Sequence, residues 1–224
     1  MTEAEWMACG DPHPMFVYLY QNPVPIPATN RKAILFAAAC CARLQPLVRF
    51  RIAKRSVEWL ETIVDSQPTL HDSEAISRSL QRAYNKSQDG RERAALNAID
   101  GARSGIRISN FYVGVWQVAL RASRAIAAGD QASEATEGFA QCDLLRDIFG
   151  NPFRPVSVDP AWLTSDVLAL ARGIYDDKAF DRMPILADAL QDAGCADPDV
   201  LNHCRGDGPH VRGCWVVDLL LGKA

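Results

Sequence analysis

The 224-residue sequence predicts an all-α protein, an irregular bundle of about eight to ten helices. Three observations favour this fold class. Helix-capping residues recur along the chain, and apolar residues repeat with helical spacing between the caps. No segment sustains the alternation of apolar and polar residues that marks a strand. The sequence also contains no nucleotide-binding glycine fingerprint and no heptad repeat.

The helices expected before residue 150 are each marked by a start or stop signal. Thr2 and Glu5 form a capping-box pattern that predicts a first short helix. Three prolines at alternate positions within 21–30 predict an extended connector. The apolar residues of 31–45 cover nearly every face, which predicts a central buried helix. The other helices are expected over 15–20, 53–65, 73–86, 91–104, 110–128 and 133–149.

The last third of the chain repeats one arrangement, a proline in the first turn of a helix. It occurs at Asp159-Pro160, Met183-Pro184 and Asp197-Pro198, and Gly194 and Gly222 close two of the expected helices. The preceding segment, 151–158, reads NPFRPVSV and predicts an extended loop.

The distribution of charge predicts two parts. The net charge is −3, yet residues 1–138 carry 16 Lys and Arg against 14 Asp and Glu, whereas residues 139–224 carry 8 against 13. We therefore expect an N-terminal helical part with basic stretches over 1–138 and an acidic helical part over 139–224, packed as one domain. This balance does not favour a strongly basic nucleic-acid-binding protein.

Cysteine use and hydropathy predict a cytoplasmic protein without a membrane span. The start of the chain lacks a secretory signal pattern, and the most apolar run, 33–42, is shorter than the roughly 20 residues of a transmembrane helix. Seven cysteines, two of them adjacent, fit reduced thiols better than a disulfide framework.

The segment 195–221 combines histidines and cysteines of the types that bind zinc. Its spacing is wider than that of a zinc ribbon. The alternative is that the cysteines are small buried apolar residues and the histidines satisfy local carbonyl groups. We therefore expect no cofactor, with zinc as the alternative. The candidate metal ligands are Cys195, His203, Cys204, His210 and Cys214.

The same segment contains a glycine-rich loop before an expected helix over 214–221. Arg205, His210 and Arg212 lie on this loop, where free backbone N–H groups and arginines could bind an anion or a partner's carboxylate. The alternative is an ordinary connector whose arginines pair with nearby aspartates.

Two basic stretches predict a candidate nucleic-acid interface. The first stretch runs from Arg31 to Arg55 and the second from Arg78 to Arg107. The alternative is a solvated surface balanced by acidic residues elsewhere. The candidate residues of the first stretch are Arg31, Lys32, Arg49, Arg51, Lys54 and Arg55.

Four blocks of sequence resemble an uncharacterised paralogous family of planctomycete bacteria of the Gemmata type. They read TEAEWMACGDPHPM, RKAILFAAACCARL, LLRDIFGNPFRP followed by DPAWL, and AFDRMPILADAL with AGC and VLNHCRGDGPHVRGCWVVDLLLGK. The resemblance covers both ends and 144–224, and the middle poorly. It implies a bacterial cytoplasmic protein and carries no catalytic residue.

The residues contain no recognisable catalytic set. We therefore expect a non-enzymatic helical interaction or regulatory module with a protein partner and no membrane contact. Nucleic-acid binding through the basic stretches and a zinc or anion site over 195–214 are the alternatives.

Overall fold

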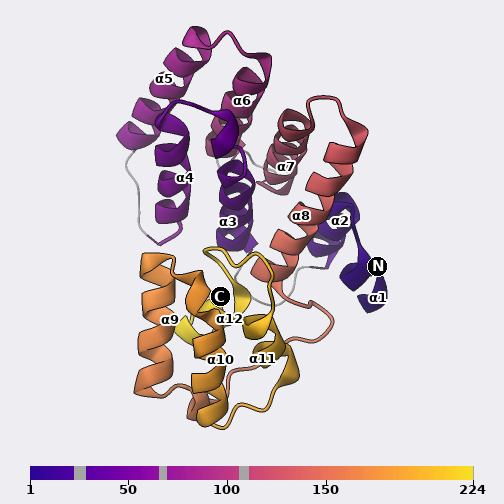
Figure 1. Cartoon of the computed structure of the whole chain (residues 1–224), viewed down its shortest axis with the longest axis vertical. Coiled ribbons are helices and arrows are strands. Elements are labelled where there is room, and N and C mark those ends of the chain that lie inside the picture. Colours follow the sequence, from indigo (N-terminus) through magenta and orange to yellow (C-terminus); the bar gives the residue numbers. More distant parts are fainter. Residues whose placement is uncertain (23–28, 66–69, 106–110, 224) are drawn as a thin grey trace. The chain divides into compact units, whose positions relative to one another are not determined.

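The computed structural model describes residues 1–22, 29–65, 70–105 and 111–223 (Figure 1). Within these ranges the regular structure is helical throughout, with twelve α-helices, three short 3₁₀ turns and no strand. The all-α prediction is confirmed. The helix count lies slightly above the expected range.

The chain divides into two compact units. The first reaches to Cys142 and the second begins at Asp143. The helices of the first unit are α1 (Glu3–Ala8), α2 (Pro12–Gln21), α3 (Thr29–Ala42), α4 (Ile52–Ile63), α5 (Leu70–Lys86), α6 (Gly90–Gly105), α7 (Phe111–Ala127) and the first part of α8 (Gln131–Phe149).

Helix α3 forms the centre of the first unit, where it packs against α4, α6 and α7. Every residue from 32 to 41 is buried, as the all-round apolar composition of this helix predicts. Helices α6 and α7 pack closely against each other along their length. The expected extended connector falls largely on residues 23–28, which lie outside the described residues.

The caps explain where several of these helices begin. The capping box is formed, since the Thr2 and Glu5 side chains accept hydrogen bonds from each other's backbone N–H groups at 3.3 and 2.7 Å. Helix α2 begins earlier than the expected residue 15, because the Asp11 side chain caps it and Pro12 occupies its first turn.

The second unit is a smaller helical cluster around one apolar core. Helix α10 packs against α9 and α11, and α12 packs against α9. Asp159-Pro160 begins only a 3₁₀ turn, and the helix that follows is capped by Thr164 instead. The elements are the turns Pro160–Trp162 and Phe180–Arg182 and the helices α9 (Ser165–Asp177), α10 (Met183–Asp192), α11 (Pro198–Arg205) and α12 (Trp215–Leu221).

In the described parts of the chain, no helix combines the length and the apolar character that crossing a bilayer requires.

Candidate metal centre

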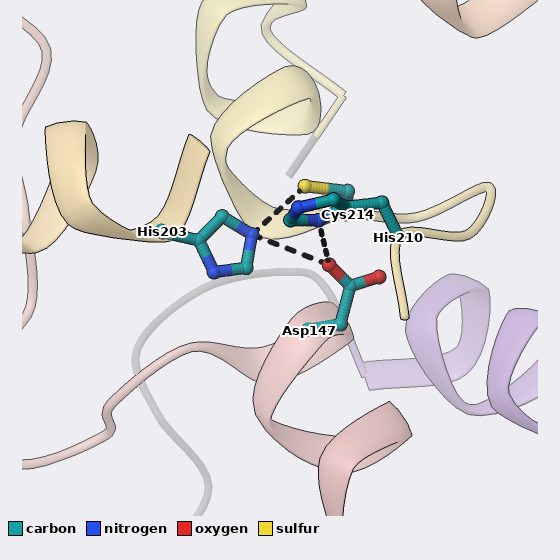
Figure 2. A group of neighbouring side chains, drawn as sticks. All are labelled: Asp147, His203, His210 and Cys214. Carbon is teal, nitrogen blue, oxygen red and sulfur yellow. Dashed lines mark hydrogen bonds and ion pairs between the residues drawn. The ribbon is translucent and has the colours of Figure 1, made fainter. Parts of the chain in front are cut away.

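Four side chains of the second unit point toward one another: Asp147, His203, His210 and Cys214 (Figure 2). Each offers one oxygen, nitrogen or sulfur atom, and these four atoms all lie within 4.8 Å of one another. A carboxylate, two imidazoles and a thiol are donor groups of the kinds that bind zinc.

Three different elements and one loop bring these side chains together. Asp147 lies in the last turn of α8, and His203 lies on α11, which is begun by the Asp197 cap and Pro198. His210 lies on the loop between α11 and α12. Cys214 occupies the residue before α12, so the cluster joins segments distant in the sequence.

A tight turn sets the position of Cys214. Its backbone N–H donates to the Val211 carbonyl at 2.9 Å, while Gly213 adopts a φ of +101°, in the left-handed region that favours glycine. The Cys214 carbonyl then accepts from Asp218, the first helical bond of α12. The thiol is therefore held where the loop meets the helix.

Three of the distances between donor atoms are short, and all four atoms lie within 4.8 Å of one another. His203 Nε2 lies 3.1 Å from Cys214 Sγ and 3.2 Å from Asp147 Oδ1, and His210 Nδ1 lies 3.0 Å from the same oxygen. Ordinary zinc bond lengths give tetrahedral edges of about 3.3–3.6 Å. Small adjustments of the side chains would therefore bring the donor atoms to the spacing that a zinc ion needs.

The cluster is withdrawn from solvent. The Asp147 and His210 side chains are 3% and 8% exposed, and Cys214 is fully buried. Burial raises the pKa of the Cys214 thiol well above its ordinary value, and the nearby Asp147 charge adds to the rise. Burial also works to raise the pKa of Asp147, but hydrogen bonds and charge from the two histidines outweigh it and hold that pKa below its ordinary value.

Neighbouring groups orient the donors. The second carboxylate oxygen of Asp147 accepts the Val211 N–H at 2.9 Å, so the first oxygen is directed at the histidines. The His203 ring packs against the rings of His210 and Trp215, with centroids 4.8 and 5.2 Å away. Nε2 of His210 is buried without a hydrogen-bond partner, so this ring is held through Nδ1 alone.

The structure brings together three of the five predicted metal ligands, namely His203, His210 and Cys214. Cys195 and Cys204 are not in the group, although both are buried. Burial raises the pKa of Cys204 to about 12, which is typical of an apolar environment. These two thiols fit the alternative interpretation, small buried residues shortly after α10 (Cys195) and in the last turn of α11 (Cys204).

Asp147 is the donor that sequence reasoning missed. It lies within LLRDIFG, and a carboxylate among apolar residues of a helix is a recognisable signal of a buried acid. No other donor of the cluster lies near Asp147 in the sequence, and His210 follows 63 residues later. Sequence spacing therefore does not link Asp147 to the other donors.

The three residues of the predicted anion site do not converge. The Arg205 guanidinium donates to Asp188 and Gln191 at 2.9 and 2.7 Å. The Arg212 guanidinium lies over the Tyr175 ring, 4.3 Å from its centroid, and His210 faces Asp147. Each side chain therefore has a different partner, and α12 is too short a helix to attract an anion by its dipole alone.

The first predicted nucleic-acid stretch is not a continuous exposed face. Lys32 is 5% exposed and lies in the first unit's core. Arg31 pairs with Asp65, Arg49 with Glu92 and Lys54 with Glu58, at 3.4, 3.5 and 3.9 Å, while Arg51 and Arg55 are exposed. In the second stretch Arg78, Arg91 and Arg103 each contact a carboxylate or a carbonyl oxygen, and Arg107 lies outside the described residues.

Comparisons with known proteins add no assignment. No protein-family model, curated protein or solved structure matches the chain. The function must therefore be argued from the four converging side chains.

Proposed function

We propose that this chain is a zinc-binding protein, and that its second unit is a small helical domain with a structural zinc centre. The observation that carries the proposal is the convergence of Asp147, His203, His210 and Cys214, whose donor atoms lie within 4.8 Å of one another. Of the alternatives open from the sequence, this one gains the most direct geometric support.

The donor set favours zinc over other common cations. Magnesium and calcium prefer all-oxygen ligands, whereas this cluster offers two imidazole nitrogens and one sulfur beside a single carboxylate. Copper(I) favours softer sets richer in thiolate or thioether. A mixed set of four nitrogen, sulfur and oxygen ligands is typical of zinc.

The number of donors favours a structural ion. Four protein ligands would complete a tetrahedral shell and leave no position for a water or a substrate, whereas catalytic zinc usually keeps one position open. Such a centre fits the non-enzymatic interaction or regulatory module expected from the sequence. In that role the ion would fix α11, α12 and the loop between them to the end of α8.

The charge of the cluster supports the same conclusion. A divalent ion would neutralise the buried Asp147 carboxylate and stabilise a thiolate at Cys214, which burial otherwise keeps protonated. Metal binding would therefore release a proton from the thiol.

The test is the metal content of the chain, with matched cysteine variants. We expect about one zinc per purified chain, and none in Cys214→Ala. Cys204→Ala is the control, because Cys204 is equally buried and lies next to His203 but outside the cluster. Replacement by cobalt(II) should give the visible absorption of a tetrahedral site and a thiolate charge-transfer band, both absent in Cys214→Ala.

Two outcomes would contradict the proposal. Wild-type protein that takes up neither zinc nor cobalt(II) would leave the cluster a hydrogen-bonded core. Equal zinc content in Cys214→Ala and wild type would place the ion at another site.

A further inference from the structure

A groove of about 750 Å³ runs between α6 and α7 in the first unit. Its lining extends from Ala94 to Ser104 on α6, about 15 Å of helix at 1.5 Å per residue. The facing wall on α7 runs from Gly114 to Ala125. The groove is therefore as long as roughly three turns of a helix laid along it.

Small residues keep the groove open. Gly101 lines it on one side and Gly114 on the other. A Cβ added at Gly101 would lie 2.8 Å from Nη1 of Arg121, so this guanidinium rests directly over the glycine. A larger residue at Gly101 would fill the space in which the arginine now lies.

The groove carries uncompensated positive charge. Arg121 and Arg124, spaced to share one face of α7, both line it and are exposed. In the described part of the chain, neither guanidinium makes an ion pair or a hydrogen bond, in contrast to most other arginines of this unit. Asp100, the one acidic residue of the lining, is already paired with Arg103 at 3.0 Å.

We propose that this groove binds an acidic amphipathic helix of a partner protein. The groove's length fits about ten residues of helix, and its walls expose more apolar than polar surface, which admits an apolar face. Two carboxylates one turn apart on the ligand helix would meet Arg121 and Arg124, whose planar guanidinium groups bind carboxylates in a bidentate manner. The inference is independent of the zinc centre, since all of these residues lie in the first unit.

The peptide used to test this proposal is obtained by selection against the protein. Helical peptides of about 15 residues, randomised on one face and displayed on phage, are selected against the full chain. Selected peptides are synthesised, and their Kd values are measured by fluorescence anisotropy. We expect enrichment of Asp and Glu at helical spacing and a Kd that rises with salt concentration.

Three variants locate the binding. The double variant Arg121→Glu with Arg124→Glu should raise Kd at least about tenfold by charge reversal. Gly101→Leu should raise it similarly by filling the groove while favouring the helix. Arg51→Glu with Arg55→Glu makes the same charge change at exposed positions at the beginning of α4 and should leave Kd unchanged. Circular dichroism verifies that each variant is folded.

Each remaining outcome overturns the proposal. Selected peptides without acidic residues would contradict the expected charge complementarity. Peptides whose Kd is unchanged in the groove variants would bind at another site. A plain DNA duplex that binds through Arg121 and Arg124, when no peptide does, would make phosphate the ligand. Self-association of the wild type that the double variant abolishes would make the occupant a second copy of the chain.

Discussion

Helix α8 carries two buried carboxylates that are compensated in different ways. Glu137, in the first unit, is paired with Arg43, whose guanidinium donates three hydrogen bonds of 2.8–3.0 Å to its oxygens. Asp147, in the second unit, faces two imidazoles and a backbone N–H. Arginine is permanently charged and does not bind metal ions, whereas a neutral imidazole is a metal ligand.

The difference teaches how to distinguish a structural ion pair from a candidate metal site. The Glu137 charge is already neutralised, and its bidentate geometry leaves no position for a cation. Among the described residues no Lys or Arg lies within ion-pair distance of Asp147, and all of its partners except the backbone are themselves metal-binding groups. A buried carboxylate surrounded by ligand groups is the better candidate.

The largest effect is expected from removing the charge of Asp147. Asp147→Asn should abolish zinc binding, because the neutral amide cannot replace the carboxylate ligand. Structural zinc contributes on the order of 10 kcal/mol to folding in small zinc domains, so α11, α12 and their loop should lose protection from hydrogen exchange. Exchange measured by mass spectrometry, with metal content on the same samples, tests this. Unchanged protection with zinc absent would mean that the ion does not hold these elements.

The matching change at Glu137 should destabilise the first unit and leave the metal in place. Glu137→Gln breaks a pair in which the acid is 1% exposed but Arg43 remains 40% exposed and can be hydrated. We expect a loss of about 2 kcal/mol in the free energy of unfolding, below the range for a fully buried pair. Urea denaturation measures the loss. An equal loss of zinc in Glu137→Gln and in Asp147→Asn would show that the two carboxylates do not have separate roles.

A smaller effect is expected where the helices end. Gly129 after α7 and Gly150 after α8 both have positive φ, +89° and +70°. An added Cβ meets nothing within 4 Å at Gly129 but lies 3.2 Å from the Trp215 ring at Gly150, and that ring packs against His203. Gly129→Ala should therefore cost only the left-handed strain, about 1 kcal/mol, whereas Gly150→Ala should also weaken zinc binding. Thermal unfolding and a competitive zinc titration compare the two; equal zinc affinity would show that the Trp215 contact does not orient His203.

The smallest effect concerns pH at the beginning of α8. Asp130 caps this helix, and hydrogen bonds from the Ser133 side chain and backbone lower its pKa. Because the pKa of Asp130 is lower in the folded protein, its charged side chain contributes fully to stability above the unfolded-state pKa of about 3.9. This contribution is lost as the pH falls through the folded-state pKa. The Tm difference between wild type and Asp130→Ala should therefore be largest near neutral pH and vanish in acid. A constant difference across this range would exclude the carboxylate as its source.

The fold was predictable from local signals, because most of its boundaries are set by residues close in sequence. The capping box at Thr2 and the positive φ at Gly194 and Gly222 are as the sequence predicts. Errors came where two local signals compete. Pro12 and Pro14 could both begin α2, and only the Asp11 hydrogen bond in the structure decides between them.

The metal centre was predictable only in part for the opposite reason. His203, His210 and Cys214 lie close in sequence, so their composition alone makes them candidates. Cys195 and Cys204 share that composition and are also buried, but their sulfur atoms do not join the four converging donors. Asp147 is placed by the packing of α8 against distant segments, which spacing in the sequence does not encode.

The spacing of the four donors makes the proposed ion a removable cross-link. His203 and Cys214 are 11 residues apart, whereas His210 and Asp147 are 63 apart, so an ion held by all four closes a long loop. A covalent link over such a loop would stabilise a chain by about 4 kcal/mol through the entropy of its unfolded state. The cell could withdraw this link by lowering the zinc supply, which it cannot do with the core of the first unit. The order in which the two units unfold would then depend on metal availability.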